Sequence, residues 1–510
     1  MMNWDMLIVF IVVFVGVTIF AFRAARWRQG DLNRLQEWGL AGRRFGTIIT
    51  WCLLGGDIYT AYTLIALPGF IFAVGALGFY AIPYAALAYI VFLLVMPKFW
   101  NVARHSGYVT PADFVRERFD SPALALLVAI TGILAVMPYI ALQMYGMEVV
   151  IAQMGVPIEI SLLIAFGFLA AYTYIGGIRA PAMIAIVKDI CIWLVVLVAV
   201  ITISVKLGGF ASIFQQVHAH ALKSPQVFHD LLPSAAYSTY GSLIIGSVLA
   251  IFLYPHILTG VLSANSAKVI RRSSILLLAY TFLLALVALL GFVAIADGIQ
   301  PSLAYGINSA LPALFAKEFP GWFAGFSFAA LAIGALTPAA IMSIAAANLF
   351  SRNIYREYIN QSCTEKQEAN TAKITSLVVK FGALAFILLG PTRLAINLQH
   401  VGNVWIIQTL PAVFLGLFTG WFHRRALIIG LLGGLFVSTW MLFAQDLLSP
   451  SWSPVVAINF LNTQMPMYAA VPSLVVNIVL CVGLTFVFRL FGISNGRDYT
   501  KLTEFETHPA

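Results

Sequence analysis

Apolar residues along the chain gather in long runs that are separated by short polar stretches. A helix needs about 20 mostly apolar residues to cross a bilayer, so these runs predict about thirteen membrane-spanning helices. The runs lie at about 5–23, 45–70, 74–97, 123–151, 156–177, 183–206, 238–262, 273–297, 321–350, 374–391, 399–422, 426–447 and 468–491. The first run lacks a preceding basic stretch and a small-residue cleavage site, so we expect an uncleaved span. The predicted fold class is an all-α integral membrane protein.

The composition indicates that lipid is the main solvent of the chain. Hydrophobic residues make up 61% of the sequence and charged residues 10%, whereas soluble domains average about 25% charged residues. The formal net charge is +9, but the basic residues lie in short loops between the apolar runs. We therefore expect the bilayer, and no nucleic acid, as a partner. The four cysteines are scattered and predict neither a disulfide framework nor a metal site.

Basic residues predict the orientation, because the cytoplasmic loops of membrane proteins collect lysine and arginine. In this chain they follow the odd-numbered spans: Arg43 and Arg44 follow the first, and Arg424 and Arg425 the eleventh. The pattern predicts a multi-pass protein of the plasma membrane, with the N-terminus outside and the C-terminus in the cytoplasm.

Two polar stretches between the spans have features of their own. Residues 207–237 contain three histidines; a solvated extracellular loop is the favoured interpretation and a metal site the alternative. Residues 106–122 are amphipathic and contain Thr110-Pro111, a helix-starting pair. They predict a short cytoplasmic helix that lies on the membrane face.

A lone carboxylate occurs in the second run, WCLLGGDIYTAYTLIALPG, where Asp57 is the only charged residue between Arg44 and Lys98. An ionised Asp at the bilayer centre costs at least ~2.5–3.5 kcal/mol. It persists if it faces a cavity, an ion or a partner; the alternative is a protonated Asp that is hydrogen-bonded to a neighbouring helix. Gly55 and Gly56 weaken the helix and predict an unwound turn whose carbonyls are available to a cation.

A second interruption is predicted in the seventh run, IFLYPHILTG, because Pro255 removes a backbone hydrogen bond. Paired broken helices in corresponding positions of two halves are typical of secondary transporters. We therefore expect one transmembrane transporter domain over residues 1–510. Its predicted parts are an extra span with a basic loop (1–44), two core halves (45–206 and 238–422), two extra spans (426–491) and a cytoplasmic tail (492–510).

Four stretches resemble the sodium/solute symporter family. They are GGDIYTAYTLIALPG, YTYIGGIRAPAMIAIVKD, YPHILTGVLSANSAKVIRRS and ANLFSRNIYREY, in this order along the chain. The family implies a LeuT-like core of two inverted halves and symport driven by a cation gradient. Within the family, GIRAPAMIAIVKD and GALTPAAIMSIAAANLFSRNIY look most like bacterial monocarboxylate permeases, which carry lactate, pyruvate and related acids.

The resemblance also implies a cation site. Carried over residue by residue, the family's sodium ligands fall on the backbone of Gly55, Ile58 and Gly334 and on the hydroxyl of Thr337. Pro338 stands where the family has a second hydroxyl, which puts sodium in doubt. Sodium and a proton carried by Asp57 both remain open, and the family favours sodium; no other cofactor is expected.

A second departure lies in the sixth run. Met183-Ile184-Ala185 stands where many members have Trp-Thr-Asp. Asp189 lies at i+4 from Ala185, on the same helix face, so it is a candidate replacement for the missing carboxylate. The favoured alternative is that Lys188 and Asp189 form a solvated pair near the cytoplasmic interface.

A small carboxylate would be attracted to the positive end of a half-helix. The candidate substrate-binding side chains are Tyr59, Thr60, Tyr62, Thr63, Tyr254, His256, Gln399 and Gln408. For the aromatic residues the alternative is ordinary packing or an interfacial belt. For His256 it is a structural bond to a carbonyl that Pro255 frees.

These observations predict a cation-coupled symporter of a short monocarboxylate such as lactate or pyruvate. The alternatives are a symporter of an amino acid such as alanine or proline and, from another class, a membrane channel. An enzyme is not expected, because the chain has no Gly-Lys dipeptide for a P-loop and no His-Glu dipeptide for a zinc site.

Overall fold

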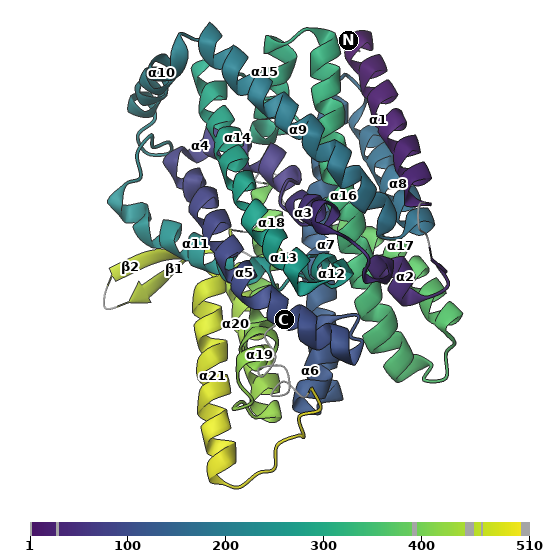
Figure 1. The fold of residues 1–510 in the computed structure, drawn as a ribbon. Helices are drawn as coiled ribbons and strands as arrows, with labels where there is room; N and C mark the ends of the chain where they lie inside the picture. The colour runs from purple at the N-terminus through teal and green to yellow at the C-terminus, as the bar shows by residue number, and fades with distance from the viewer. Residues whose placement is uncertain (1–2, 27–29, 390–394, 444–452, 461–462, 501–510) are drawn as a thin grey trace.

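The structure is a computed structural model that describes residues 3–26, 30–389, 395–443, 453–460 and 463–500. The ends of the predicted spans 374–391 and 426–447, and the last residues of the predicted tail, lie outside these ranges. Figure 1 shows a bundle of long helices, with α10 and the β1–β2 hairpin on the left and α2 on the right.

From the N-terminus to residue 251 the helices are α1 (Trp4–Ala25), α2 (Leu35–Leu40), α3 (Thr47–Gly56), α4 (Leu67–Val74), α5 (Ala81–Ser106), α6 (Pro111–Phe119), α7 (Pro122–Gln153), α8 (Ile158–Gly176), α9 (Arg179–Lys206), α10 (Gly209–Lys223) and α11 (Tyr237–Ile251). The helices after residue 251 are α12 (Pro255–Ser263), α13 (Ala267–Leu276), α14 (Leu278–Ala296), α15 (Ala310–Glu318), α16 (Gly321–Phe350), α17 (Glu365–Leu389), α18 (Ile396–Ile406), α19 (Gly416–Phe418), α20 (Arg424–Phe443) and α21 (Ala470–Leu490).

Shorter helical segments connect them. The 3₁₀ segments are η1 (Ala41–Arg43), η3 (Ala76–Tyr80), η4 (Ser234–Ala236), η5 (Gly306–Ser309) and η7 (Ile407–Thr409). The π segments are η2 (Tyr62–Ala66), η6 (Ser351–Ile359) and η8 (Pro411–Leu415). The strands β1 (Val455–Phe460) and β2 (Thr463–Tyr468) pair antiparallel, with Val455 opposite Tyr468.

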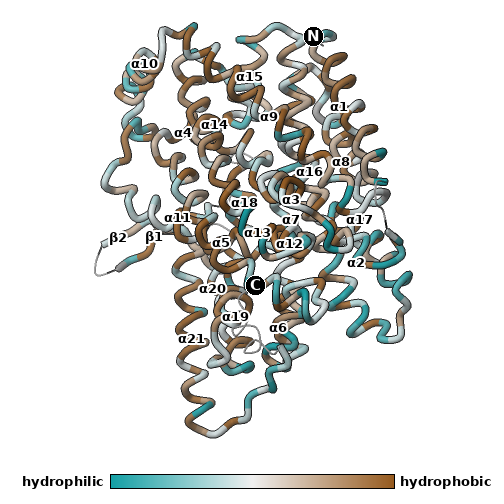
Figure 2. Tube along the Cα trace, viewed as in Figure 1, coloured by the Kyte–Doolittle hydropathy of each residue, from teal (hydrophilic) through white to brown (hydrophobic). Residues whose placement is uncertain are grey.

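The predicted membrane spans are found as helices. Within the described residues, 10 helices are long and apolar enough to cross a membrane, or up to 11 with the bent pair Ile396–Thr409 and Pro411–Phe418. Shorter apolar helices cover the two remaining predicted spans, the broken second one and the fifth. Figure 2 shows the hydrophobic colour along these helices and polar residues near α2, α6 and α10.

Two spans are interrupted where the sequence predicts it. Helix α3 ends at Gly56, and η2 follows at Tyr62 after a non-helical turn. Helix α11 ends at Ile251, and α12 begins at Pro255, which occupies the first helical position. Proline is well tolerated there because the first amides of a helix have no intrahelical partner.

Helix α16 lies at the centre of the bundle. Its most apolar window of 18 residues is 100% buried, whereas that of α1 is 22% buried. Alanine and glycine are frequent in α16, and such small residues let neighbouring helices approach closely. At Gly334, for example, an added Cβ would meet Leu64 at 2.9 Å and Ile192 at 3.3 Å. Helix α16 therefore packs against both η2 and α9.

Some connections contain more structure than the sequence predicts. The stretch 207–237, expected to be a loop, contains the helix α10. His218 pairs with Asp230 at 2.6 Å, and no group of three metal-liganding side chains occurs within the described residues. Helix α6 forms as predicted, with Thr110 and Asp113 as its capping box, but Phe114 and Phe119 are buried. It is thus packed against the bundle.

Candidate functional site

Asp57 lies at the interruption of the second span, directly after α3. Its side chain is fully buried, and neither carboxylate oxygen has a hydrogen-bond partner among the residues that the structure describes. The expected alternative, a hydrogen bond to a neighbouring helix, is therefore not seen. An added Cβ at Gly260 in α12 would lie 3.8 Å from Asp57 Oδ2, so the two broken spans meet here. Since a helix C-terminus carries partial negative charge, the end of α3 and Asp57 together favour a cation.

Lys188 from α9 contacts the same turn. Its side chain is fully buried, and Nζ donates to the carbonyls of Gly56 at 3.0 Å and Tyr59 at 3.3 Å. Asp189 Oδ1 lies 3.4 Å from this nitrogen. The favoured expectation of a solvated Lys188–Asp189 pair is wrong, because α9 brings both residues against the interruption and buries them.

Tyr280 of α14 completes this side of the turn. Its hydroxyl donates to Asp189 Oδ2, and its own carbonyl accepts from the Tyr59 hydroxyl. Position 55 faces the Tyr280 ring, where an added Cβ would lie 2.2 Å from the nearest ring atom. Only glycine fits such a close approach, so Gly55 serves packing as well as the interruption. Asp189 thus lies beside the turn, as a replacement carboxylate would.

The backbone positions expected to hold a cation are engaged within the turn. The Gly55 carbonyl accepts from the amides of Ile58 at 3.0 Å and Tyr59 at 2.9 Å. The Ile58 carbonyl accepts from the Thr63 hydroxyl at 2.6 Å. The Thr337 hydroxyl donates to Ile333 in its own helix at 3.0 Å. Hydrogen bonds of the protein therefore reach three of the four expected oxygen positions, those of Gly55, Ile58 and Thr337.

A chain of polar groups lies on the other side of the broken helix. The hydroxyls of Tyr62 and Tyr80 are 2.6 Å apart, and the Tyr80 hydroxyl is 2.7 Å from His400 Nε2. His256 and Tyr254 have ring centroids 5.1 Å apart. Both ring nitrogens of His256 lack hydrogen-bond partners in the described part of the chain. The structural alternative, in which His256 bonds a freed carbonyl, is therefore not seen.

Other candidates have separate roles or positions. The Thr60 hydroxyl accepts from the amide of Tyr62 at 3.0 Å, which stabilises the turn. Tyr254 donates to the Gln399 carbonyl at 3.4 Å, while the Gln399 side-chain oxygen has no partner among the described residues. Gln408 contacts α20 and α21 instead. Its amide donates to Ser473 at 2.9 Å, and an added Cβ at Gly434 would meet its Oε1 at 2.2 Å.

A small apolar cavity lies between the two interruptions. Its walls include Ile58 after the first interruption and Phe252 and Ile257 around the second, with Tyr84 and Tyr89 from α5. The cavity lies near the polar chain, because the ring of Tyr84 stacks on that of Tyr80.

Several polar residues of this region were not among the sequence candidates. Gln143 of α7 accepts from the amide of Ala61 at 2.8 Å and so satisfies a donor that the interruption frees. His400 and Tyr80 form the polar chain, and Lys188 contacts the turn. Gln143, Lys188 and His400 are polar residues inside apolar runs, which is the same signal that identified Asp57.

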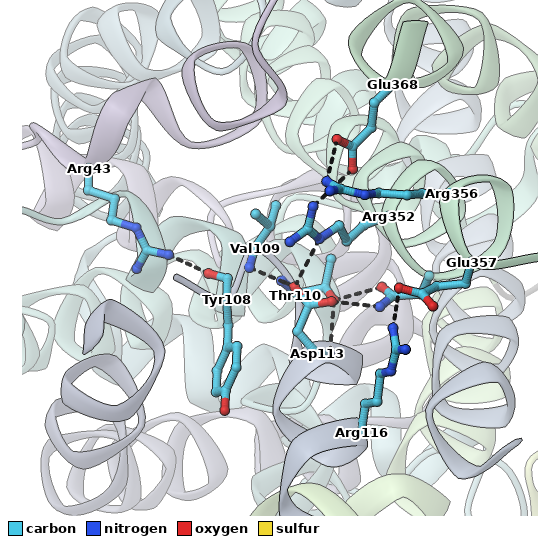
Figure 3. A network of polar contacts seen from close by, with 11 residues as sticks. Arg43, Tyr108, Val109, Thr110, Asp113, Arg116, Arg352, Arg356, Glu357 and Glu368 are labelled. Carbon is cyan, nitrogen blue, oxygen red and sulfur yellow. Dashed lines mark hydrogen bonds and ion pairs between the residues drawn. The ribbon is translucent and has the colours of Figure 1, made fainter. Parts of the chain in front are cut away.

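A polar network connects the two predicted core halves near α2 and α6 (Figure 3). Asn353 donates to Asp113 Oδ1 and accepts from the Thr110 hydroxyl, both at 2.7 Å. Arg352 lies 3.8 Å from Asp113 and 3.4 Å from Glu368. Further links are the ion pairs Arg116–Glu357 and Arg356–Glu368 and the hydrogen bond from Arg43 to the Tyr108 carbonyl. The network joins the two predicted halves at this face of the bundle.

The chain is similar to several known proteins. Residues 38–434 match the sequence profile of the sodium:solute symporter family. The chain belongs to this family. A monocarboxylate transport permease protein of Rhizobium johnstonii is 47% identical over 481 residues, which cover 94% of this chain and 96% of that protein. The uncharacterized symporter YodF of Bacillus subtilis is 35% identical over 445 residues, or 86% of this chain and 87% of that protein.

A solved structure of a sodium-coupled sialic acid symporter, in a substrate-bound outward-open state, has the same fold. The TM-score is 0.76 at 15% identity, and the match covers 96% of this chain and 99% of that one. The expected LeuT-like inverted-repeat fold is thereby confirmed. As a member of the sodium:solute symporter family, the protein is a multi-pass membrane transporter for a small solute and not an enzyme.

Proposed function

We propose that the protein is a cation-coupled symporter that moves a short monocarboxylate, such as lactate or pyruvate, across the plasma membrane. The observation that carries the proposal is the buried, unpartnered carboxylate of Asp57 where two interrupted helices meet. Buried charges are retained in membranes at sites of ion or proton passage. The 47% identical relative named for monocarboxylate transport supports the substrate class, and the family name makes sodium the first ion to test.

The substrate would lie between α12 and the polar chain. The N-terminus of α12 carries partial positive charge, and Pro255 and His256 are its first residues. Tyr62, Tyr80 and His400 offer hydroxyl and imidazole groups for a carboxylate. The apolar cavity beside them suits the short hydrocarbon part of such an acid. A monocarboxylate has one anionic group, which these polar groups would bind, and one short apolar part, which the cavity wall would contact.

Alternating access would follow from movement of the two core halves, 45–206 and 238–422, about this site. The network around Asp113 and Asn353 joins the halves, so it must open when solute leaves on that side. We place this side in the cytoplasm, with the N-terminus outside, because the neighbouring loops carry most of the basic residues.

Transport by purified protein in liposomes tests the proposal. Labelled lactate should exchange for unlabelled lactate inside, and pyruvate should compete better than acetate, alanine or proline. Exchange of this kind separates a carrier from a channel. Asp57→Asn should lower ion-driven lactate uptake by roughly ten-fold or more, whereas Asp230→Asn, in the connection after α10, should not. An Asp57→Asn variant with normal uptake and ion dependence would contradict the assignment; preference for alanine or proline would reject the substrate class.

A further inference from the structure

A second cavity, of about 680 Å³, lies away from the candidate solute site and shares no lining residue with the apolar cavity described above. Its walls come from the end of α1, the starts of α3 and α9, and the connection between α12 and α13. These helix ends lie on the side that we place in the cytoplasm. The cavity is therefore at the depth where the polar and apolar parts of the bilayer meet.

Two helix N-termini meet at this cavity. Helix α3 begins at Thr47 and α9 begins at Arg179, and neither is capped by a side-chain hydrogen bond. The first amides of a helix have no intrahelical acceptor and carry partial positive charge. The first turn of α3, Thr47 to Ile49, lines the cavity. Amides in such a position are suited to bind an anion.

Two arginines that line the cavity share one carboxylate. Glu37 Oε1 lies 2.6 Å from Arg44 Nη2, and Glu37 Oε2 lies 3.2 Å from Arg179 Nη2, so one positive charge is left over among these three groups. The Arg44 side chain is 53% exposed. Nε of the buried Arg179 has no hydrogen-bond partner among the described residues. A buried donor without an acceptor is costly, so the arginines also favour an anion here.

The end of α1 changes this balance little. A helix C-terminus carries partial negative charge, but Arg23 lies in the last turn of α1 and offsets it. No acidic side chain is among the lining residues that the structure describes. The electrostatic surroundings of the cavity are therefore positive.

The wall that faces the membrane is apolar. Ile48 of α3 is 65% exposed, and Met183 and Ile186 lie one turn apart on a half-buried face of α9. The same face continues to Ile190, which is 64% exposed. Exposed apolar side chains on membrane-spanning helices contact acyl chains. A free phosphate would meet only the polar end of this cavity, whereas a phospholipid would contact both the polar end and the apolar wall.

We propose that this cavity binds an anionic phospholipid of the cytoplasmic leaflet. Its phosphate lies against the first amides of α3 and beside Arg44 and Arg179, and an acyl chain follows Ile48 and Ile186. Basic pockets between membrane helices bind anionic headgroups in this way. A choline group would find no free carboxylate, because Glu37 is already shared by two arginines. Since α3 runs from the cavity to the interruption, the lipid holds the inner end of the first broken helix.

Binding is tested with the full-length protein, purified in a mild detergent. Phosphatidylglycerol serves as the anionic lipid, and phosphatidylcholine with the same acyl chains serves as the neutral one. Native mass spectrometry counts the bound lipids, and the unfolding temperature reports the stabilisation by a ligand. Phosphatidylglycerol should bind more tightly by roughly five-fold or more and raise the unfolding temperature. Equal binding of the two lipids would overturn the proposal.

Substitutions then locate the bound lipid. Arg44→Gln should weaken phosphatidylglycerol binding by roughly five-fold. Arg34→Gln is the matched control, because Arg34 is also exposed and paired with one carboxylate, that of Glu365 at 2.9 Å, but does not line this cavity. Wild-type binding in Arg44→Gln, or equal losses in the two variants, would contradict the site. If Arg44→Gln does not fold, the comparison of the two lipids on the wild-type protein decides.

Glycerol 3-phosphate distinguishes a lipid from a free phosphate compound, because it has the phosphate of the headgroup without the acyl chains. It should neither displace phosphatidylglycerol nor raise the unfolding temperature at the same concentration. Displacement at equal concentration would show that the cavity takes a free phosphate and would overturn the lipid assignment. None of these measurements uses a transported solute, so their outcome is independent of the proposed function.

Discussion

The Gly56 carbonyl accepts a hydrogen bond from Lys188 at 3.0 Å, and this contact joins the end of α3 to the middle of α9. It brings the charged group of one span to the unwound turn of another. The two residues lie far apart in the sequence. Because the bond joins them, movement of the turn is coupled to movement of α9 while the bond persists. Movement of α9 relative to α3 must therefore change the surroundings of the ammonium.

Gly56→Ala tests this relationship directly. The new Cβ would lie 2.8 Å from Lys188 Nζ, so the lysine must shift. Overpacking of this kind costs about 1–3 kcal/mol, and we expect a lower unfolding temperature in detergent together with weaker coupled uptake. Gly483→Ala in α21 is the matched control, since nothing lies within 4 Å of its added Cβ. Equal behaviour of the two variants would show that Lys188 does not fill this space in the membrane.

Loss of Gln143 should destabilise the first interruption. Its Oε1 accepts from the Ala61 amide at 2.8 Å, and a buried amide left without a partner costs about 1–3 kcal/mol. Gln143→Leu should lower the unfolding temperature and the lactate affinity. Gln143→Glu keeps an acceptor at the same reach and should recover most of the loss. Calorimetry and lactate binding measure both effects; two variants with equal losses would contradict the role of the acceptor.

The interruptions were predictable from sequence because their signals are local. Gly55, Gly56 and Asp57 in an apolar run, and Pro255 in another, each weaken a helix at a position that can be read from the sequence. The Lys188 contact was not predictable in this way. It depends on how α9 packs on α3, and a Lys-Asp pair near a predicted boundary fits a solvated position equally well.

The candidate substrate site was likewise only partly predictable from the sequence. The structure brings Tyr62, Tyr254, His256 and Gln399 to the centre, as their positions in or beside the broken helices suggest. The direction of a side chain on a longer span depends on its tertiary neighbours. His400 was therefore not predicted, although it follows Gln399 in the sequence and contacts Tyr80.

Asn353→Ala should loosen the network between the two halves. It removes two hydrogen bonds, to Asp113 and from Thr110, each worth about 0.5–1.5 kcal/mol. Amides of α6 should then exchange hydrogen faster by roughly ten-fold. Asn360→Ala, directly after η6, is the control, because its side chain bonds the nearby Tyr355 and Ser362 and does not contact α6. Unchanged exchange in α6 would mean that these bonds do not hold the face closed.

Gln408 is a buried polar residue that holds helices together, although the sequence alone makes it a candidate for contact with the substrate. The sequence makes it a candidate for binding, but its amide donates to Ser473, and its carbonyl groups accept from Asn477 at 2.8 and 3.1 Å. Gln408→Leu removes the side-chain hydrogen bonds with Ser473 and Asn477 and keeps only the bond from Asn477 to the backbone carbonyl, which should lower stability by about 1–3 kcal/mol. We expect a lower unfolding temperature and an unchanged KM for lactate in the folded fraction, measured by initial uptake rates. Tyr80→Phe removes the hydroxyl that links Tyr62 to His400. This variant should raise the KM for lactate and leave the unfolding temperature nearly unchanged. A raised KM in Gln408→Leu at normal stability would place this glutamine in the substrate site after all.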